Sequence, residues 1–236
     1  MNEVTTVVAL TLMAGIAMPV GALLACADSI HPNWMNSEMR HGIIAFGGGA
    51  LLSAIALVLV PEGIESVSIP LAATCFAGGG LAFLALDVLL DKIKSPGGQL
   101  VAMLSDFVPE AIALGASLAS GSPTAKLLAA MIAIQNLPEG FNAYREMTLN
   151  SKKSGRRVIV AFFAMALLGP CAGLSGYYIL ASYDTLVSCM MLFASGGILY
   201  LVFQDIAPEA RLQRRWMPAM GAVFGFLLGL LGKMLV

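Results

Sequence analysis

Long apolar segments separated by short polar stretches fill almost the whole chain of 236 residues. A helix that crosses a bilayer needs roughly 17 to 25 mainly apolar residues to match the hydrocarbon core. The pattern therefore predicts an all-α polytopic membrane protein with eight transmembrane helices, in which residues 1–236 form a single transmembrane domain. We place the spans at about residues 4–26, 42–62, 69–90, 99–120, 124–147, 157–181, 185–206 and 216–236.

The basic residues give this topology an orientation, because Lys and Arg accumulate in cytoplasmic loops. Only two of the thirteen basic residues, Lys126 and Lys233, fall on one side of the predicted membrane. An even number of spans with this bias places both termini outside the cytoplasm. The residues on the cytoplasmic side are Arg40, Lys92, Lys94, Arg145, Lys152, Lys153, Arg156, Arg157, Arg211, Arg214 and Arg215.

The composition narrows the class of partner. Hydrophobic residues make up 58% of the chain and charged residues only 11%, so lipid is the expected solvent. The net charge of −1 argues against nucleic acid, which is bound by basic surfaces. We expect the lipid bilayer as a partner and allow for a homodimer. The compact loops are typical of a bacterial inner membrane protein.

Two segments repeat the same pattern in opposite directions across the predicted membrane. Residues 47–52 are glycine-rich and lead to Pro61-Glu62, and residues 195–200 are glycine-rich and lead to Pro208-Glu209. Such inverted repeats are typical of transporters. We therefore expect the first three spans to be related to the last three, around the fourth and fifth spans. Chance recurrence of glycine and Pro-Glu in apolar helices is the alternative.

The fourth and fifth spans each carry a Pro-Glu pair near their centre. Asp106 and Glu110 lie on one face of span 99–120, and Gln135 and Glu139 lie on one face of span 124–147, because each pair is four residues apart. Three ionised acids at this depth cost on the order of 8 kcal/mol, and no Lys or Arg occurs there to pair with them. Protonation or a bound cation must neutralise them, and either indicates ion movement.

Several polar residues allow a second interpretation. Gln135 and Asn136 are as consistent with hydrogen bonds between membrane helices as with ligation. Asp87, Asp205 and Glu209 fall near cytoplasmic helix ends, where they are either solvated ends or an exit path for cations.

The motif Gln135 to Gly140 resembles the His-Asn-x-Pro-Glu-Gly motif of the ZIP family of metal transporters, and Asp106 to Gly115 resembles its partner motif in the fourth helix. The stretch Ala194 to Glu209 is also similar to the family's seventh helix. The resemblance implies uptake of zinc, iron, manganese or similar divalent cations into the cytoplasm, by movement of one helix group against the other. It implies a metal site formed by Asp106, Glu110, Gln135, Asn136 and Glu139. The metal is the transported ion, and no resident cofactor is expected.

The chain departs from the family pattern at four positions. Asp106 and Gln135 replace the usual histidines, Phe107 replaces an asparagine, and Gly169 replaces a glutamate that helps to form a second metal site. These differences predict one site instead of two, with oxygen ligands only. Oxygen ligands suit magnesium, calcium and manganese, and carboxylates also bind zinc and ferrous iron.

Three other functions stay open at this stage. A carrier of the same architecture could move a non-metal cation, and a relative that has lost transport could act as a scaffold. A membrane enzyme is disfavoured, because no serine or cysteine has a base at motif spacing and no basic residue accompanies the central acids.

Overall fold

The computed structural model describes residues 2–30, 37–93, 98–149, 155–180, 182–212 and 215–235, and within these ranges every regular element is a helix. The predicted all-α class is therefore confirmed for this part of the chain. Lys94, Lys152, Lys153 and Arg214 lie outside the described residues. The elements are α1 (Glu3–Ile30), α2 (Ser37–Ala54), η1 (Ile55–Leu59), α3 (Val60–Gly63), α4 (Ile69–Ile93), α5 (Gly98–Ala119), α6 (Ala125–Leu149), α7 (Gly155–Ala166), α8 (Leu168–Ser175), η2 (Gly176–Leu180), α9 (Asp184–Leu201), η3 (Val202–Ile206), α10 (Ala207–Ala210) and α11 (Met217–Met234), where η marks a π-helical segment.

Six helical stretches in the described residues are long and apolar enough to cross a membrane. Large apolar side chains also point outward from them, for example Leu81 on α4 and Val223 on α11, as expected where lipid replaces water. The chain is therefore an integral membrane protein by length and composition of its helices. The six stretches are Glu3–Ala27, Glu38–Gly63, Ile69–Lys92, Gly155–Leu180, Asp184–Ala210 and Met217–Met234.

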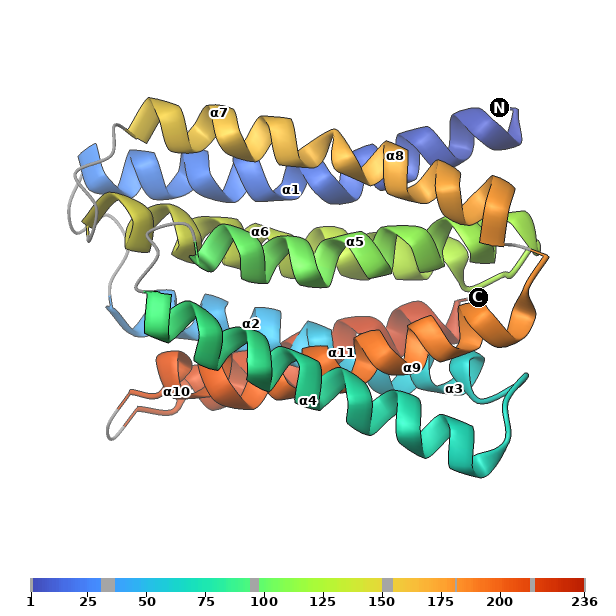
Figure 1. The fold of residues 1–236 in the computed structure, drawn as a ribbon. Helices are drawn as coiled ribbons and strands as arrows, with labels where there is room; N and C mark the ends of the chain where they lie inside the picture. The colour runs from blue at the N-terminus through green and yellow to red at the C-terminus, as the bar shows by residue number, and fades with distance from the viewer. Residues whose placement is uncertain are drawn as a thin grey trace.

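Helices α5 and α6 lie between two groups of helices (Figure 1). On one side α1 packs along α6 and α8 packs along α5. On the other side α2 pairs with α11 and α4 pairs with α9, and α2 and α9 contact the central helices. The two chain termini lie at the same end of the bundle, and α7 begins and α10 ends at the opposite end (Figure 1).

Glycines bring the paired helices into backbone contact. A Cβ atom at Gly21 of α1 would overlap the carbonyl oxygen of Leu137 on α6, and one at Gly140 of α6 would overlap the carbonyl oxygen of Met18 on α1. The α4–α9 pair is built in the same way, through Gly79. Small residues at such contacts are the usual means by which membrane helices associate, because burial of apolar surface contributes little free energy to association within lipid.

Two π-helical segments precede the Pro-Glu pairs that the sequence singled out. Segment η1 begins at Ile55, six residues before Pro61, and η3 begins at Val202, six residues before Pro208. Proline has no N–H to donate to the preceding turn, so a wider turn at this place accommodates the missing hydrogen bond. In contrast, α5 and α6 stay α-helical through Pro109 and Pro138.

Neighbouring glycines on α4 provide a test of the backbone contacts. A Cβ atom at Gly79 would overlap the carbonyl oxygen of Phe193, whereas one at Gly78 would meet nothing within 4 Å. We expect Gly79→Ala to lower the free energy of unfolding by about 1–3 kcal/mol, the usual cost of overpacking. The measurement is unfolding of purified protein in detergent, with Gly78→Ala as the matched control. Equal stability of the two variants would contradict the α4–α9 contact.

Candidate functional site

The five residues predicted to form the site lie in the middle of α5 and α6. Four of them, Asp106, Glu110, Gln135 and Asn136, are between 0% and 4% exposed. Glu139 is partly buried. Helical periodicity accounts for this arrangement, since residues four apart share one face of a helix.

A direct contact between the two central helices joins Glu110 to Gln135. The Gln135 side-chain amide donates hydrogen bonds to both carboxylate oxygens of Glu110, and each nitrogen–oxygen distance is 2.7 Å. Hydrogen bonds to a carboxylate are short and strong, and a buried carboxylate requires them. The amide oxygen Oε1 of Gln135 is buried and has no hydrogen-bond partner among the described residues.

Asp106 completes a group of three acids. Electrostatic interactions connect Asp106 with Glu110 and Glu139, and Glu110 with Glu139. The Oδ1 atom of Asp106 is buried and, in the described part of the chain, has no hydrogen-bond partner. Two orphaned oxygen acceptors, on Asp106 and Gln135, therefore lie in the central helices beside Glu110. A buried acceptor without a partner is costly, and a cation would remove that cost.

No three His, Cys, Asp or Glu side chains of the described residues stand close enough together to hold a metal ion jointly. The predicted residues are thus gathered in the middle of the bundle, but they are not arranged as a finished coordination sphere. Their oxygens can supply a cation site only together with other oxygens, such as amides or water.

Asn136 makes a different contact from the other four. Its side-chain amide donates a hydrogen bond of 2.9 Å to the backbone carbonyl of Ala14 on α1. This is the helix-to-helix hydrogen bond that was the alternative interpretation of Asn136. It fixes α6 against α1, next to the glycine contacts at Gly21 and Gly140.

A small cavity of about 60 Å³ extends the site away from the central pair. It is lined by two of the predicted acids and by residues of α6, η3 and α10, and Asn142 donates a hydrogen bond of 3.3 Å to Glu209 across it. Asn142 was missed by the sequence analysis, although its position three residues after Glu139 places it on the same helix face. The polar lining residues are Asp106, Glu139, Asn142, Asp205 and Glu209.

Phe107 fills the side of α5 that faces α1 and α8. Its side chain is 1% exposed. Its ring tip lies 3.0 Å from where a Cβ atom of Gly15 would stand and 2.8 Å from where one of Gly169 would stand. Two of the four positions at which the sequence differs from the motifs it resembles, 107 and 169, are thus in contact.

At the end of the bundle opposite the acidic cavity, an acid joins one helix group to the central helix α5. The Glu62 carboxylate, which follows η1, accepts hydrogen bonds from the hydroxyls of Ser117 at 3.0 Å and Ser122 at 3.2 Å. Ser117 belongs to α5 and Ser122 to the turn after it. These bonds tie the end of α3 to the end of α5.

Comparison of the chain with protein-family models and with curated proteins found no match.

The Glu110–Gln135 pair can be tested by its contribution to stability. Gln135→Met keeps the length of the side chain but removes both N–H donors. The buried Glu110 carboxylate then loses its two hydrogen bonds from this residue. We expect a loss of about 1–3 kcal/mol in the free energy of unfolding. Gln204→Met on η3, where the side chain is exposed, is the matched control and should change stability little. The same small effect for both variants would mean that the Gln135 amide does not support Glu110.

Proposed function

We propose that this chain is a divergent ZIP-like transporter that moves divalent metal cations, such as zinc, iron or manganese, toward the cytoplasm. The observation that carries the proposal is the pair of buried oxygens without hydrogen-bond partners, Asp106 Oδ1 and Gln135 Oε1, beside the Glu110 carboxylate. No basic residue lies between Lys94 and Lys126 or between Lys126 and Arg145 to neutralise this group. A hydrated or partly dehydrated cation is the simplest species that satisfies all of these oxygens.

The proposal includes eight spans, because α5 and α6 have 22 and 25 residues and run alongside the six apolar stretches. It also includes an inverted repeat. The α1–α6 and α5–α8 pairs correspond under this repeat, as do the α2–α11 and α4–α9 pairs. The π-helical segments before the two outer Pro-Glu pairs, with identical spacing to their prolines, support the same relation.

The two ends of the bundle support an orientation in the membrane for this proposal. The acidic cavity lined by Asp205 and Glu209 adjoins the end that carries Arg211 and Arg215, which positive-inside bias assigns to the cytoplasm. At the other end, Glu62 is engaged by Ser117 and Ser122. This arrangement fits a cytoplasm-open conformation whose outer side is closed. Both termini are then extracytoplasmic, and an inner membrane is the expected location.

A second candidate is a carrier of the same architecture for a non-metal cation. The lack of a three-ligand metal group in the described residues favours it, and so does the replacement of histidine by Asp106 and Gln135. In that case the acids would serve as counter-charges for the cation instead of ligands.

Uptake by purified protein in liposomes tests the site. We expect Glu110→Gln and Glu139→Gln to lower the initial rate of metal uptake on the order of tenfold or more, since even indirect support of a metal ligand is worth that much. The exposed Glu65, in the turn before α4, provides the control variant Glu65→Gln, which should transport normally. Undiminished uptake in both site variants would refute the site, and competition among metals in the same assay would rank them.

Metal binding should weaken toward acid pH, because protons and metal compete for the same carboxylates. Because metal binding displaces protons from the carboxylates, the affinity for the metal should rise with pH over about pH 5 to 8. Calorimetry in buffers of different ionisation enthalpy measures both the affinity and the protons released. An affinity that does not depend on pH would contradict carboxylate ligation. No binding heat with any divalent cation would favour the non-metal carrier.

A further inference from the structure

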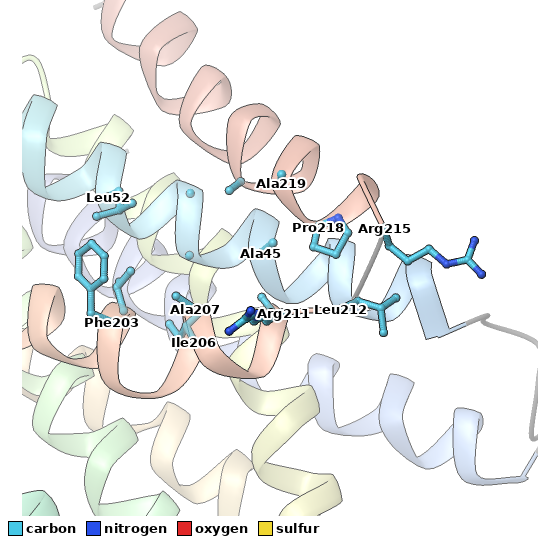
Figure 2. Close-up of a pocket in the computed structure, with 15 residues that line it drawn as sticks. Ala45, Leu52, Phe203, Ile206, Ala207, Arg211, Leu212, Arg215, Pro218 and Ala219 are labelled. Carbon is cyan, nitrogen blue, oxygen red and sulfur yellow. The ribbon is translucent and has the colours of Figure 1, made fainter.

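A second cavity lies away from the acidic group, on the outer surface of the bundle between α2, α11 and the segment formed by η3 and α10 (Figure 2). Its volume is about 380 Å³, and its wall is almost entirely aliphatic. Ala45, Gly48 and Gly49 of α2 form its floor, with Ile206 packed against Gly48 and the α11 backbone at Ala222 packed against Gly49. We call this cavity the α10–α11 groove.

The α10–α11 groove has an apolar end and a cationic end. Leu52 and Phe203 lie at one end, Arg215 extends from the other, and Arg211 lies between them beside Ala207 (Figure 2). Eight residues separate Phe203 from Arg211, so the groove runs for roughly 12 Å along the helix axis. Phe203 is 66% exposed within an apolar stretch that can cross a membrane, so it faces lipid.

The two guanidinium groups are available to an anion. Arg211 makes no ion pair with any of the described residues, and the single pair of Arg215 is with Glu38 at 3.4 Å, between side chains that are 59% and 34% exposed. Such an exposed pair contributes little and exchanges readily. Arginine presents a planar set of donors that matches a phosphate group, often with two parallel hydrogen bonds.

We propose that the α10–α11 groove binds an anionic phospholipid, with an acyl chain along α2 between α11 and the η3–α10 segment and the headgroup at the end that carries Arg211 and Arg215. One such molecule carries both groups that match the groove: a hydrocarbon chain for its apolar end, and a negative charge about 12 Å from that end. The charge lies at the end of the bundle opposite the termini, where basic residues accumulate. Basic side chains at this level of a membrane attract anionic headgroups.

Trp216 provides a probe next to the cationic end. It follows Arg215 directly and is 82% exposed. The chain contains one other tryptophan, Trp34, which Trp34→Phe removes. The experiment reconstitutes this single-tryptophan protein in phosphatidylcholine vesicles that contain a minor fraction of brominated phosphatidylglycerol or brominated phosphatidylcholine. Bromine quenches nearby tryptophan, so the quenching of Trp216 measures which lipid occupies the groove.

We expect brominated phosphatidylglycerol to be preferred by roughly fivefold for each arginine, the usual contribution of one basic residue near an anionic lipid surface. The double variant Arg211→Gln/Arg215→Gln should reduce the preference to within about twofold. Ala219→Leu, at an exposed position that lines the groove, should also reduce it by filling the space for the acyl chain. The control Arg156→Gln/Arg157→Gln removes two exposed charges from α7 at the same end of the bundle and should leave the preference unchanged.

Four outcomes would overturn the proposal. Equal quenching by the two lipids in the parent protein would exclude selectivity for an anionic headgroup. An unchanged preference in the Arg211→Gln/Arg215→Gln variant, or an equal loss in the α7 control, would place the preference elsewhere. Loss of the preference on addition of inorganic phosphate, with no effect of Ala219→Leu, would indicate an ion site without a lipid chain. Weak quenching by both lipids would mean that protein, such as a second copy of this chain, covers the groove.

Discussion

Direct contact between helix backbones at glycine residues sets the positions of the two central helices, and the site depends on those positions. Gly21 and Gly140 bring α1 and α6 together, and Gly115 brings α5 against the backbone of Gly173 on α8. No side chain intervenes at these points, so the helix axes have little freedom to shift. The consequence is a geometry in which a glutamine amide on α6 reaches both oxygens of a carboxylate on α5 at 2.7 Å.

Burial of acids in such a tightly packed bundle requires other polar groups nearby. The Glu110 carboxylate is satisfied by Gln135, while Asp106 keeps one oxygen without a partner among the described residues. Lipid offers no compensation for such an atom. An apolar side chain in place of Asp106 would be simpler for packing alone. Packing alone therefore does not account for Asp106, and under the proposed function a cation would balance its charge.

Part of this arrangement could be predicted from the sequence. The length of the apolar segments was sufficient for the all-helical class and for the membrane. Helical spacing was sufficient to place Asp106 with Glu110 on one face of α5 and Gln135 with Glu139 on one face of α6. The pairing of Gln135 with Glu110 was not predictable, because it depends on the rotation of α5 relative to α6. The same holds for Asn136, whose partner Ala14 is 122 residues away. The contact of Phe107 with Gly15 and Gly169 likewise joins three helices that are distant in sequence.

Among the described residues, Ile206 is the one side chain that lines both the acidic cavity and the α10–α11 groove. It lies at the end of the π-helical segment η3, whose wider turn is less regular than the α-helices around it. At this point a single aliphatic side chain lies between the cavity lined by carboxylates and the groove that we propose to hold lipid. A change in the molecule that fills the groove would shift the Ile206 side chain and so change the shape of the acidic cavity, even if α5 and α6 did not move. The lipid composition of the membrane would then affect the acidic cavity, as the residues that line it do.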